Sequence, residues 1–372
     1  MEDKKITISV DARPLESPLT GIGYYTHYLL KEMIKFTPSW VWNLYSTKPF
    51  LSGLDGYENV NIRTGWESRR YTSSIYSQVL FPLWANKDKA DIFWSPRHHL
   101  PLFLVGRIKK CVTVHDLVWH RHPETMSALG RYLDRLLMPK SVHMADLVVS
   151  VSNSTKAELN DILRPKKQQA IVSPAPKPLM KSFIWNETKA SESYFLFVGT
   201  NEPRKNLARL IEAFNLALKS GISIRKLVVV GMKGWGRDEL AYSIQRFNLH
   251  SNVDVKDYLS ESELIDLYRG AHALVMPSLY EGFGMPLVEA MSCGIPVITS
   301  NCSSMPEVAG NAALYVDPFD VGSIADAMIL MSDDVVKHKE LSQNAVVKVK
   351  EYSWEKSAQK MIALIEECVS CN

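Results

Sequence analysis

Two glutamates stand eight residues apart around a glycine-rich turn, in the segment Glu281-Gly282-Phe283-Gly284-Met285-Pro286-Leu287-Val288-Glu289. Glycine lets a backbone turn tightly and come close to a ligand, and proline is favoured in the first turn of a helix. The unpaired N–H groups and the dipole of a helix start attract anions. A diphosphate would fit there, with the two carboxylates accepting hydrogen bonds from hydroxyl groups on either side of it. The alternative interpretation is an ordinary strand-to-helix turn with two solvated glutamates.

The elements that must position this segment are those of a parallel α/β fold, because strand-like and helix-like stretches alternate along the chain. Strands are predicted at 6–10, 91–95, 111–114, 147–151, 194–199, 226–230, 252–255, 273–276 and 297–300, and helices at 24–36, 155–163, 207–219 and 354–368. Ligands bind beyond the carboxyl ends of the strands in such sheets. The glycine turn follows the predicted strand at 273–276, so it lies where binding is expected.

A proline-rich stretch divides the chain. Three prolines occur within 173–178 and a polar stretch follows, which is typical of a linker. At about 150 residues per domain, the 372 residues predict two domains. We expect an N-terminal domain at 1–175, a linker at 176–193, a C-terminal domain at 194–353 and a final helix at 354–372.

The composition is that of a globular chain with an uneven charge. Hydrophobic residues make up 46% and charged residues 22%, which excludes disordered, collagen-like and disulfide-stapled classes. Residues 1–175 hold 23 Lys and Arg against 16 Asp and Glu, and the remainder hold 20 against 24. The basic half suggests an anionic partner, although ordinary scatter of charge would give the same counts. Residues 1–5 lead into no apolar signal region, so a cytoplasmic location is expected.

The glycine turn and its surroundings resemble retaining glycosyltransferases of family 4, which have the GT-B fold. The likeness runs through the whole chain and is more specific in the second half. It is carried by residues 281–289 and by the segments 21–23, 113–116, 199–207, 290–298 and 303–308. It implies two Rossmann-like domains that face each other across a cleft, with a nucleoside-diphosphate sugar on the C-terminal domain and the acceptor on the N-terminal domain. The final helix would cross back onto the first domain.

The resemblance implies a role for each residue of the donor site. Glu289 would hold the ribose hydroxyls and Glu281 the donor sugar. Lys205, with Arg204, would neutralise the diphosphate, because negative charge builds on the phosphate as the glycosidic bond breaks. The sugar and phosphates would be covered by Phe283, Gly284, Met285, Pro286 and Leu287.

Two N-terminal segments are implied at the reacting end of the donor. Backbone N–H groups would come from Gly21, Ile22 and Gly23. His115 would touch the donor sugar, and Asp116 could fix its ring; the alternative is a histidine satisfied at a domain interface.

Many family members have an arginine where this chain has Thr200. Arg204 is the candidate to compensate for it.

Neither a cofactor nor a metal ion is expected. The sequence has no Asp-x-Asp pair, which the other major glycosyltransferase fold commonly uses to hold a divalent metal on the diphosphate. Four histidines near His115 lack the spacing of a metal site: His98, His99, His120 and His122. The loop at 231–236 follows a predicted strand and could border the nucleobase.

The acceptor and any surface partner have to be argued from the N-terminal half. Its basic clusters are Arg69-Arg70, then Arg107, Lys109 and Lys110, then Arg131, Arg135 and Lys140. One interpretation is a face that meets an anionic membrane, on the inner side of the cell membrane, and a glycan or lipid-linked acceptor. The other is solvated charge over an apolar core. Nucleic acid is not an expected partner, because the basic residues follow no nucleic-acid-binding pattern.

The functional hypothesis is metal-independent transfer of a hexose from a nucleoside diphosphate to an acceptor hydroxyl, with retention of the anomeric configuration. The likeness is strongest to bacterial mannosyl- or rhamnosyl-type transferases that build surface polysaccharides such as O-antigen, and GDP-mannose is the expected donor. The alternatives are a glycan phosphorylase-like enzyme and a non-catalytic sugar-nucleotide-binding protein of the same fold.

Overall fold

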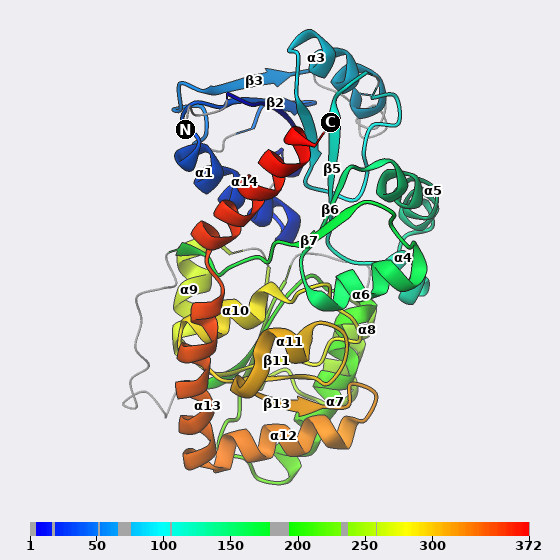
Figure 1. Cartoon of the computed structure of the whole chain (residues 1–372). Helices are drawn as coiled ribbons and strands as arrows, with labels where there is room; N and C mark the ends of the chain where they lie inside the picture. The colour runs from blue at the N-terminus through cyan, green and yellow to red at the C-terminus, as the bar shows by residue number, and fades with distance from the viewer. Residues whose placement is uncertain are drawn as a thin grey trace. The chain divides into compact units, whose positions relative to one another are not determined.

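The computed structural model describes residues 5–16, 19–50, 53–65, 76–104, 106–178, 193–231, 237–257 and 259–371. The chain divides into two units (Figure 1). The first consists of Met1–Pro174 with Ser353–Asn372, and the second of Ala175–Tyr352. Most of the predicted linker, residues 179–192, lies outside the described residues.

The first unit is built on a seven-stranded parallel sheet with the order β3-β2-β1-β4-β5-β6-β7. The strands are β1 (Thr7–Asp11), β2 (Val41–Ser46), β3 (Val60–Thr64), β4 (Ile92–Ser95), β5 (Lys109–Val114), β6 (Leu147–Ser150) and β7 (Gln168–Ile171). The interior strands β4 and β6 are buried at every residue. Parallel sheets covered on both faces produce this pattern.

Helices follow most strands of the first unit, as crossover connections between parallel strands require. The α-helices are α1 (Gly21–Phe36), α3 (Phe81–Lys87), α4 (Val118–Arg121), α5 (Ala128–Met144), α6 (Asn153–Ile162) and α14 (Trp354–Ser370), with shorter turns η1 (Arg13–Leu15), η2 (Tyr76–Leu80) and η3 (Pro123–Thr125). The core between the sheet and these helices is built from large side chains such as Tyr45, Phe81, Phe93 and Met138.

The second unit has a six-stranded parallel sheet with the order β10-β9-β8-β11-β12-β13. The strands are β8 (Tyr194–Val198), β9 (Leu227–Val230), β10 (Val253–Lys256), β11 (Ala271–Met276), β12 (Val297–Ser300) and β13 (Ala313–Val316). The order reverses between β8 and β11, which is the doubly wound Rossmann arrangement. Ligands bind at such a reversal, beyond the carboxyl ends of the strands.

The helices of the second unit surround a core rich in phenylalanine, with Phe195, Phe197 and Phe214 fully buried. They are α7 (Leu207–Lys219), α8 (Arg237–Arg246), α9 (Glu261–Gly270), α10 (Met285–Ser292), α11 (Met305–Ala309), α12 (Val321–Asp333) and α13 (Val335–Lys348), with turns η6 (Pro203–Lys205), η7 (Gly310–Ala312) and η8 (Val349–Glu351). Figure 1 shows α7 and α12 beside each other on this sheet.

The last helix, α14, packs on α1 within the first unit (Figure 1). The Trp354 ring lies 5.6 Å from that of Tyr28 and 6.1 Å from that of Tyr25. The Ser357 hydroxyl donates to the Ser173 carbonyl at 2.7 Å. The first unit is therefore assembled from both ends of the described chain.

The predicted fold class, α/β with two parallel sheets, is confirmed by this architecture. No helix among the described residues has the length and apolar character needed to cross a membrane.

Candidate functional site

Two loops of the second unit meet at the point where the strand order reverses. One follows β8 and contains η6, and the other follows β11 and leads to α10. The Leu279 N–H donates to the Arg204 carbonyl at 2.7 Å. The side-chain amide of Asn206 donates to the carbonyls of Pro277 and Pro318 at 2.9 and 2.6 Å. These bonds fix the lysine-bearing turn against the glutamate-bearing loop, so residues 76 positions apart become neighbours.

Arg204 and Lys205 converge on the carboxylate of Glu281. Lys205 Nζ lies 2.5 Å from Glu281 Oε1, and Arg204 Nη1 lies 3.1 Å from Glu281 Oε2. The Lys205 and Glu281 side chains are each only 8% exposed. Burial alone would raise the pKa of Glu281, but the charges of Lys205 and Arg204 outweigh it and lower that pKa to about 2. The carboxylate is therefore ionised at every physiological pH.

Glu202 holds Arg204 in this arrangement. The Arg204 Nε–H donates to Glu202 Oε2 at 2.9 Å, and the Thr200 hydroxyl donates to Glu202 Oε1, also at 2.9 Å. Thr200, which stands where many family members have arginine, thus belongs to the same network as Arg204. The guanidinium is fixed between the carboxylates of Glu202 and Glu281.

The loop before α10 presents unpaired backbone donors. Gly284, at the helix N-cap, has a φ of +93°, a conformation that glycine adopts without steric cost. No hydrogen-bond acceptor for the N–H groups of Phe283, Gly284 and Met285 occurs in the part of the chain that the structure describes. Phe283 and Gly284 are buried. Buried N–H groups without acceptors are costly, and at a helix start they form a ready anion site.

The backbone of this loop is pinned from the side. The Ser303 hydroxyl accepts from the Glu281 N–H at 3.0 Å, and the Ser304 hydroxyl donates to the Glu281 carbonyl at 2.8 Å. The Phe283 ring packs edge-on against Tyr352, with the ring centroids 5.4 Å apart. Glu281 is thereby held at a fixed distance from the start of α10.

Glu289 lies on α10 in a different environment from Glu281. It is buried, and its Oε2 accepts a hydrogen bond from the Tyr268 hydroxyl at 2.8 Å. The Lys177 ammonium lies 3.8 Å from Oε1. Burial raises the pKa of Glu289, and the charge of Lys177 and the Tyr268 hydroxyl offset only part of this effect.

Tyr268 and Lys177 were not recognised from the sequence. Tyr268 belongs to α9, before β11, and Lys177 follows the predicted domain boundary. Both are buried, with 0% and 2% of their surfaces exposed. The only sequence signal at Lys177 was its position among three prolines. A charged residue in a linker is ordinarily expected to be exposed, so its burial was not predicted.

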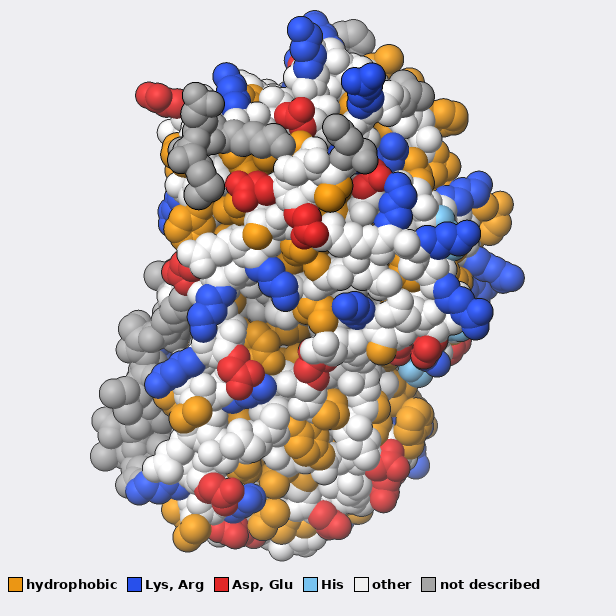
Figure 2. Space-filling view, viewed as in Figure 1, with side chains coloured by type: hydrophobic (Ala, Val, Ile, Leu, Met, Phe, Trp, Pro, Cys, Tyr) orange, Lys and Arg blue, Asp and Glu red, His pale blue; other side chains and the backbone are white. Residues whose placement is uncertain are grey.

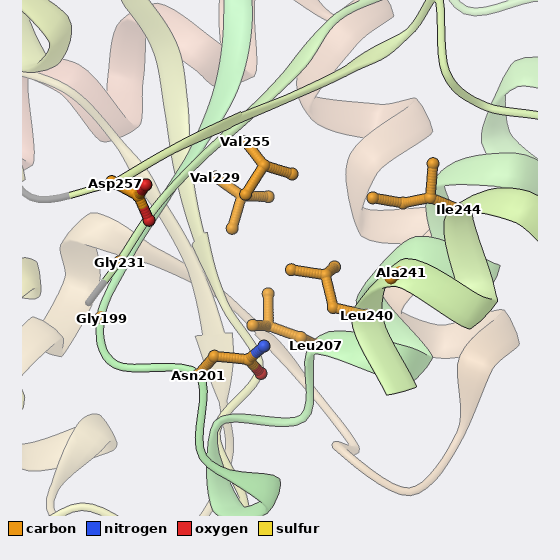
Figure 3. Close-up of a pocket in the computed structure, with 10 residues that line it drawn as sticks. All are labelled: Gly199, Asn201, Leu207, Val229, Gly231, Leu240, Ala241, Ile244, Val255 and Asp257. Carbon is orange, nitrogen blue, oxygen red and sulfur yellow. The ribbon is translucent and has the colours of Figure 1, made fainter. Parts of the chain in front are cut away.

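A cavity of about 270 Å³ lies between α7, α8 and the carboxyl ends of β9 and β10 (Figure 3). Most lining side chains are apolar: Leu207, Val229, Leu240, Ala241, Ile244 and Val255. Figure 3 shows the polar side chains of Asn201 and Asp257 on the side of Gly199 and Gly231. A Cβ on Gly231 would come within 2.1 Å of the Gly199 carbonyl oxygen, so only glycine lets the two strand ends approach. The remainder of the predicted nucleobase loop, 232–236, lies outside the described residues.

His115 follows β5 in the first unit, as expected, but Asp116 does not fix its ring. The Nε2–H of His115 donates to the Pro96 carbonyl at 2.8 Å, and the Tyr25 ring lies edge-on at 5.0 Å. The Asp116 carboxylate accepts instead from the Val118 N–H, at 3.4 Å. Burial, with the nearby His98, lowers the pKa of His115 to about 4. The ring is therefore neutral at pH 7, with Nε2 protonated and Nδ1 left as the acceptor.

Gly21, Ile22 and Gly23 form the first turn of α1, where helix N–H groups have no partner within the helix. Thr20, the N-cap residue, offers them no side-chain hydrogen bond. The segment thus supplies backbone donors of the predicted kind in the first unit. Of the predicted basic clusters, Arg69-Arg70 lie outside the described residues.

Three histidines near His115 each have a different polar partner. His98 Nε2 accepts from the His115 N–H at 3.2 Å, and His99 Nε2 lies 2.8 Å from Asp134 Oδ1. His122 Nδ1 lies 3.2 Å from Glu124. Within the described ranges, His, Cys, Asp and Glu side chains form no group of three or more suited to a metal ion.

A family model described as "Glycosyl transferases group 1" matches residues 181–367, half of the chain. The chain belongs to this family, and it is a retaining hexosyltransferase of family 4, as the sequence predicted.

Two curated relatives are bacterial mannosyltransferases. The "O-antigen chain mannosyltransferase B" of Escherichia coli is 28% identical, over 94% of this chain and 96% of its own length. The "O-antigen chain mannosyltransferase RfbU" of Salmonella typhimurium is 33% identical over 63% of each chain.

Solved structures share the fold over nearly the whole chain. Sucrose-phosphate synthase from Thermosynechococcus elongatus superposes with a TM-score of 0.81 at 18% identity, covering 99% of this chain and all of that one. Anabaena HepE, in complex with UDP and glucose, gives a TM-score of 0.72 at 15% identity, covering 98% of this chain and all of that one. The GT-B fold class is confirmed by these matches.

Proposed function

We propose that this enzyme transfers mannose from GDP-mannose to a hydroxyl group of a glycan or lipid-linked glycan, without a metal ion. The observation that carries the proposal is the convergence of Arg204 and Lys205 on Glu281, beside the unpaired N–H groups at the start of α10. The full-length relative that acts on O-antigen supports mannose and a polysaccharide acceptor.

The diphosphate is proposed to bind between these cations and the start of α10. An ammonium has three donors, and Lys205 uses one of them on Glu281. The others can reach a phosphate oxygen, together with the N–H groups of Phe283, Gly284 and Met285. Pro286 and Leu287, in the same turn, would cover the bound group. Charge-assisted hydrogen bonds of this kind are among the strongest available to a protein.

The two glutamates are proposed to hold the sugars on either side of the diphosphate. Glu281, ionised and fixed by two cations, would accept from hydroxyls of the mannose. Glu289 would bridge the two ribose hydroxyls, since a carboxylate has two oxygens for a vicinal diol. Tyr268 orients the Glu289 carboxylate through one lone pair of Oε2 and leaves other lone pairs for the ribose.

The guanine is proposed to enter the cavity between α7 and α8 (Figure 3). The base edge of guanine carries N1–H and N2–H donors side by side, and the Asp257 carboxylate is a matching pair of acceptors. The apolar walls supply contact for the base faces. Uracil offers one N–H between two carbonyls, which suits a lone carboxylate less well.

Transfer is proposed to proceed on one face of the mannose. As the bond from the anomeric carbon to the phosphate oxygen breaks, negative charge grows on that oxygen, and Lys205 and Arg204 stabilise it. The acceptor hydroxyl attacks from the side of the departing phosphate and gives its proton to that phosphate. His115 and the N–H groups of Gly21, Ile22 and Gly23 remain proposed contacts of the donor sugar.

A thermal-shift series tests the donor assignment, because a ligand that binds the native state raises apparent stability. GDP and GDP-mannose should raise the melting temperature of the enzyme, and UDP and UDP-glucose should raise it less. Asp257→Asn should remove most of the preference for GDP. Equal shifts from both nucleotides, with the wild type and with Asp257→Asn, would contradict the guanine assignment and leave the transferase class intact.

A further inference from the structure

The first unit carries an exposed apolar stripe on α5. Leu129, Tyr132 and Leu136 have 58%, 64% and 41% of their surfaces exposed. Their spacing of i, i+3 and i+7 places them along one side of the helix. Exposed apolar residues that gather in this way mark interaction surfaces, whereas scattered single ones do not.

Cations border this stripe. Arg131 and Arg135 lie one turn apart beside it, and Lys140 lies one turn beyond Leu136; all three are exposed. No ion pair joins them to an acidic side chain within the part of the chain that the structure describes. Asp134 is the one acidic residue of α5, and its Oδ1 lies 2.8 Å from Nε2 of His99. We call the six residues Leu129, Arg131, Tyr132, Arg135, Leu136 and Lys140 the α5 surface.

Figure 2 shows Lys and Arg side chains interleaved with hydrophobic ones along the rim of the first unit where Figure 1 places α5. A further exposed aromatic, Phe103, follows a segment tied to α5, because the Leu100 N–H donates to the Ser141 hydroxyl at 2.9 Å. The Leu102 N–H donates to the Gln78 side chain of η2 at 2.8 Å. Phe103 thus lies three residues along the chain from a backbone contact with the C-terminal part of α5.

Two exposed apolar residues of the second unit have a different charge environment. Val335 and Val336, at the start of α13, are 73% and 80% exposed. The neighbouring Lys337 pairs with Glu340 at 2.9 Å. An apolar patch whose nearby cation is already neutralised has no preference for an anionic partner. This pair is a matched control for the α5 surface.

We propose that the α5 surface binds an anionic lipid bilayer. Its leucines and tyrosine would enter the headgroup region, and its arginines and lysine would face the lipid phosphates, since long cationic side chains keep their charged ends in the polar layer. A convex helix face with an apolar stripe and a cationic border matches an extended anionic plane. The purpose of this contact, delivery of a lipid-linked acceptor, rests on the proposed function; the contact itself does not.

Flotation of the full chain with vesicles tests the proposal. The wild type should float with phosphatidylglycerol-containing vesicles at low salt, and far less at high salt, because exposed charges are screened. It should not float with pure phosphatidylcholine. Arg131→Glu/Arg135→Glu should lose most of the bound fraction, and Leu129→Ser/Tyr132→Ser/Leu136→Ser should lose at least half. Val335→Ser/Val336→Ser should float as the wild type does.

Several results would overturn the bilayer assignment. One is a wild type that stays unbound at low salt, and another is α5 variants that float undiminished. A dimer seen by sedimentation and abolished by the α5 changes would assign the surface to a second copy of the chain instead. Hydrolysis of GDP-mannose, measured in the same samples without vesicles, should be unchanged in the α5 variants. If the wild type floats but GDP-mannose does not raise its melting temperature, the donor assignment fails and the lipid surface stands.

Discussion

The surroundings of Glu281 and Glu289 are opposite, although the two residues stand eight positions apart. Glu281 meets two cations within 3.1 Å, and its pKa falls to about 2. Glu289 meets a hydroxyl at 2.8 Å and an ammonium only at 3.8 Å, and burial raises its pKa. Both side chains are buried to a similar degree. The difference therefore comes from the distance to cations and not from exposure.

Glu281 therefore stays ionised over the physiological pH range, whereas Glu289 is protonated more readily. Pairs of titratable groups whose environments push their pKa values apart are typical of functional sites. Glu281 keeps Lys205 and Arg204 in place before any ligand arrives. In the proposed function, Glu289 would accept further hydrogen bonds from hydroxyl groups of the donor. One short segment would thus hold both a preorganised part and a ligand-dependent part of the proposed site.

The largest effect should come from removing the ammonium at Glu281. Lys205→Ala should reduce kcat by about 100- to 1,000-fold, the usual cost of losing one donor that stabilises developing charge. Steady-state mannosyl transfer, or hydrolysis of GDP-mannose, measures it. Lys219→Ala, at the exposed end of α7, is the matched control and should behave as the wild type. A decrease of less than fivefold in Lys205→Ala would remove Lys205 from the proposed site.

Donor binding should weaken at acidic pH because Glu289 becomes protonated; we call this part of the pH profile the acid limb. The raised pKa of Glu289 means that it is protonated on acidification well before Glu281, and a protonated carboxyl loses acceptor capacity. The Kd of GDP-mannose, measured by calorimetry, should begin to rise on acidification at a pH above that expected for a glutamate of ordinary pKa, 4.5. In Glu289→Gln the Kd should be high at pH 7 and nearly constant with pH. An unchanged acid limb in this variant would contradict the assignment.

The loss of protein stability at acidic pH has to be distinguished from the effect of Glu289 protonation on donor binding. The pKa of His272 falls to about 4 through burial and the nearby His338. Stability from the neutral ring is complete above about pH 6.5 and is lost as the pH falls towards 4. Glu281 acts lower, from about pH 4.5 to 2, and Glu289 has the opposite sign because its pKa is raised. Tm followed by circular dichroism should therefore decline below pH 6.5; a constant Tm down to pH 4 would contradict this order.

A smaller effect on donor binding should follow from removing the hydrogen bond that orients the Glu289 carboxylate. Tyr268→Phe removes the hydroxyl that orients the carboxylate, and a hydrogen bond to a charged group of this kind is worth about tenfold in binding. The Kd for GDP-mannose should rise by about that factor, and the acid limb should move to higher pH because the ionised form loses a donor. Tyr242→Phe, on the exposed face of α8, is the control. A change in Tm with neither binding effect would reduce Tyr268 to a structural residue.

The smallest effect should come from Glu202. Glu202→Gln keeps an acceptor for Thr200 or Arg204 but removes the charge that holds the guanidinium, so kcat should fall by a few-fold with little change in KM. Glu239→Gln, exposed on α8, is the matched control. A loss as large as that of Lys205→Ala would mean that Arg204, and not Lys205, dominates the stabilisation of the phosphate.

The segment proposed to bind the donor could be located from the sequence because its chemically distinctive residues are contiguous and follow a predicted strand. The glycine turn, the proline and both glutamates lie within one continuous stretch, and a predicted strand precedes it. The pairing of Lys205 with Glu281 was not predictable from spacing, since it depends on β8 and β11 being neighbours in the sheet. Tyr268 and Lys177 were missed for the same reason: they approach Glu289 from 21 and 112 positions away.

The strands that the sequence analysis missed are mostly those at the sheet edges. β3 and β7 have a neighbour on one side only, and all their residues except Ala170 are half-buried or exposed, so apolar residues are few. β13 is the edge of the second sheet. β2 is the exception, since it is nearly all buried and was overlooked between a helix and a polar loop. Central strands, by contrast, are apolar runs that stand out in the sequence.

The packing of α14 on α1 has a consequence for the order in which the protein matures during translation. Tyr25 and Tyr28 of α1 leave the ribosome more than 320 residues before Trp354 of α14. The second unit is synthesised in full before the first can cover these rings, so the N-terminal half must wait, partly open, for its last helix. Nascent chains stalled before residue 353 should accordingly be the stage at which chaperones engage the first unit.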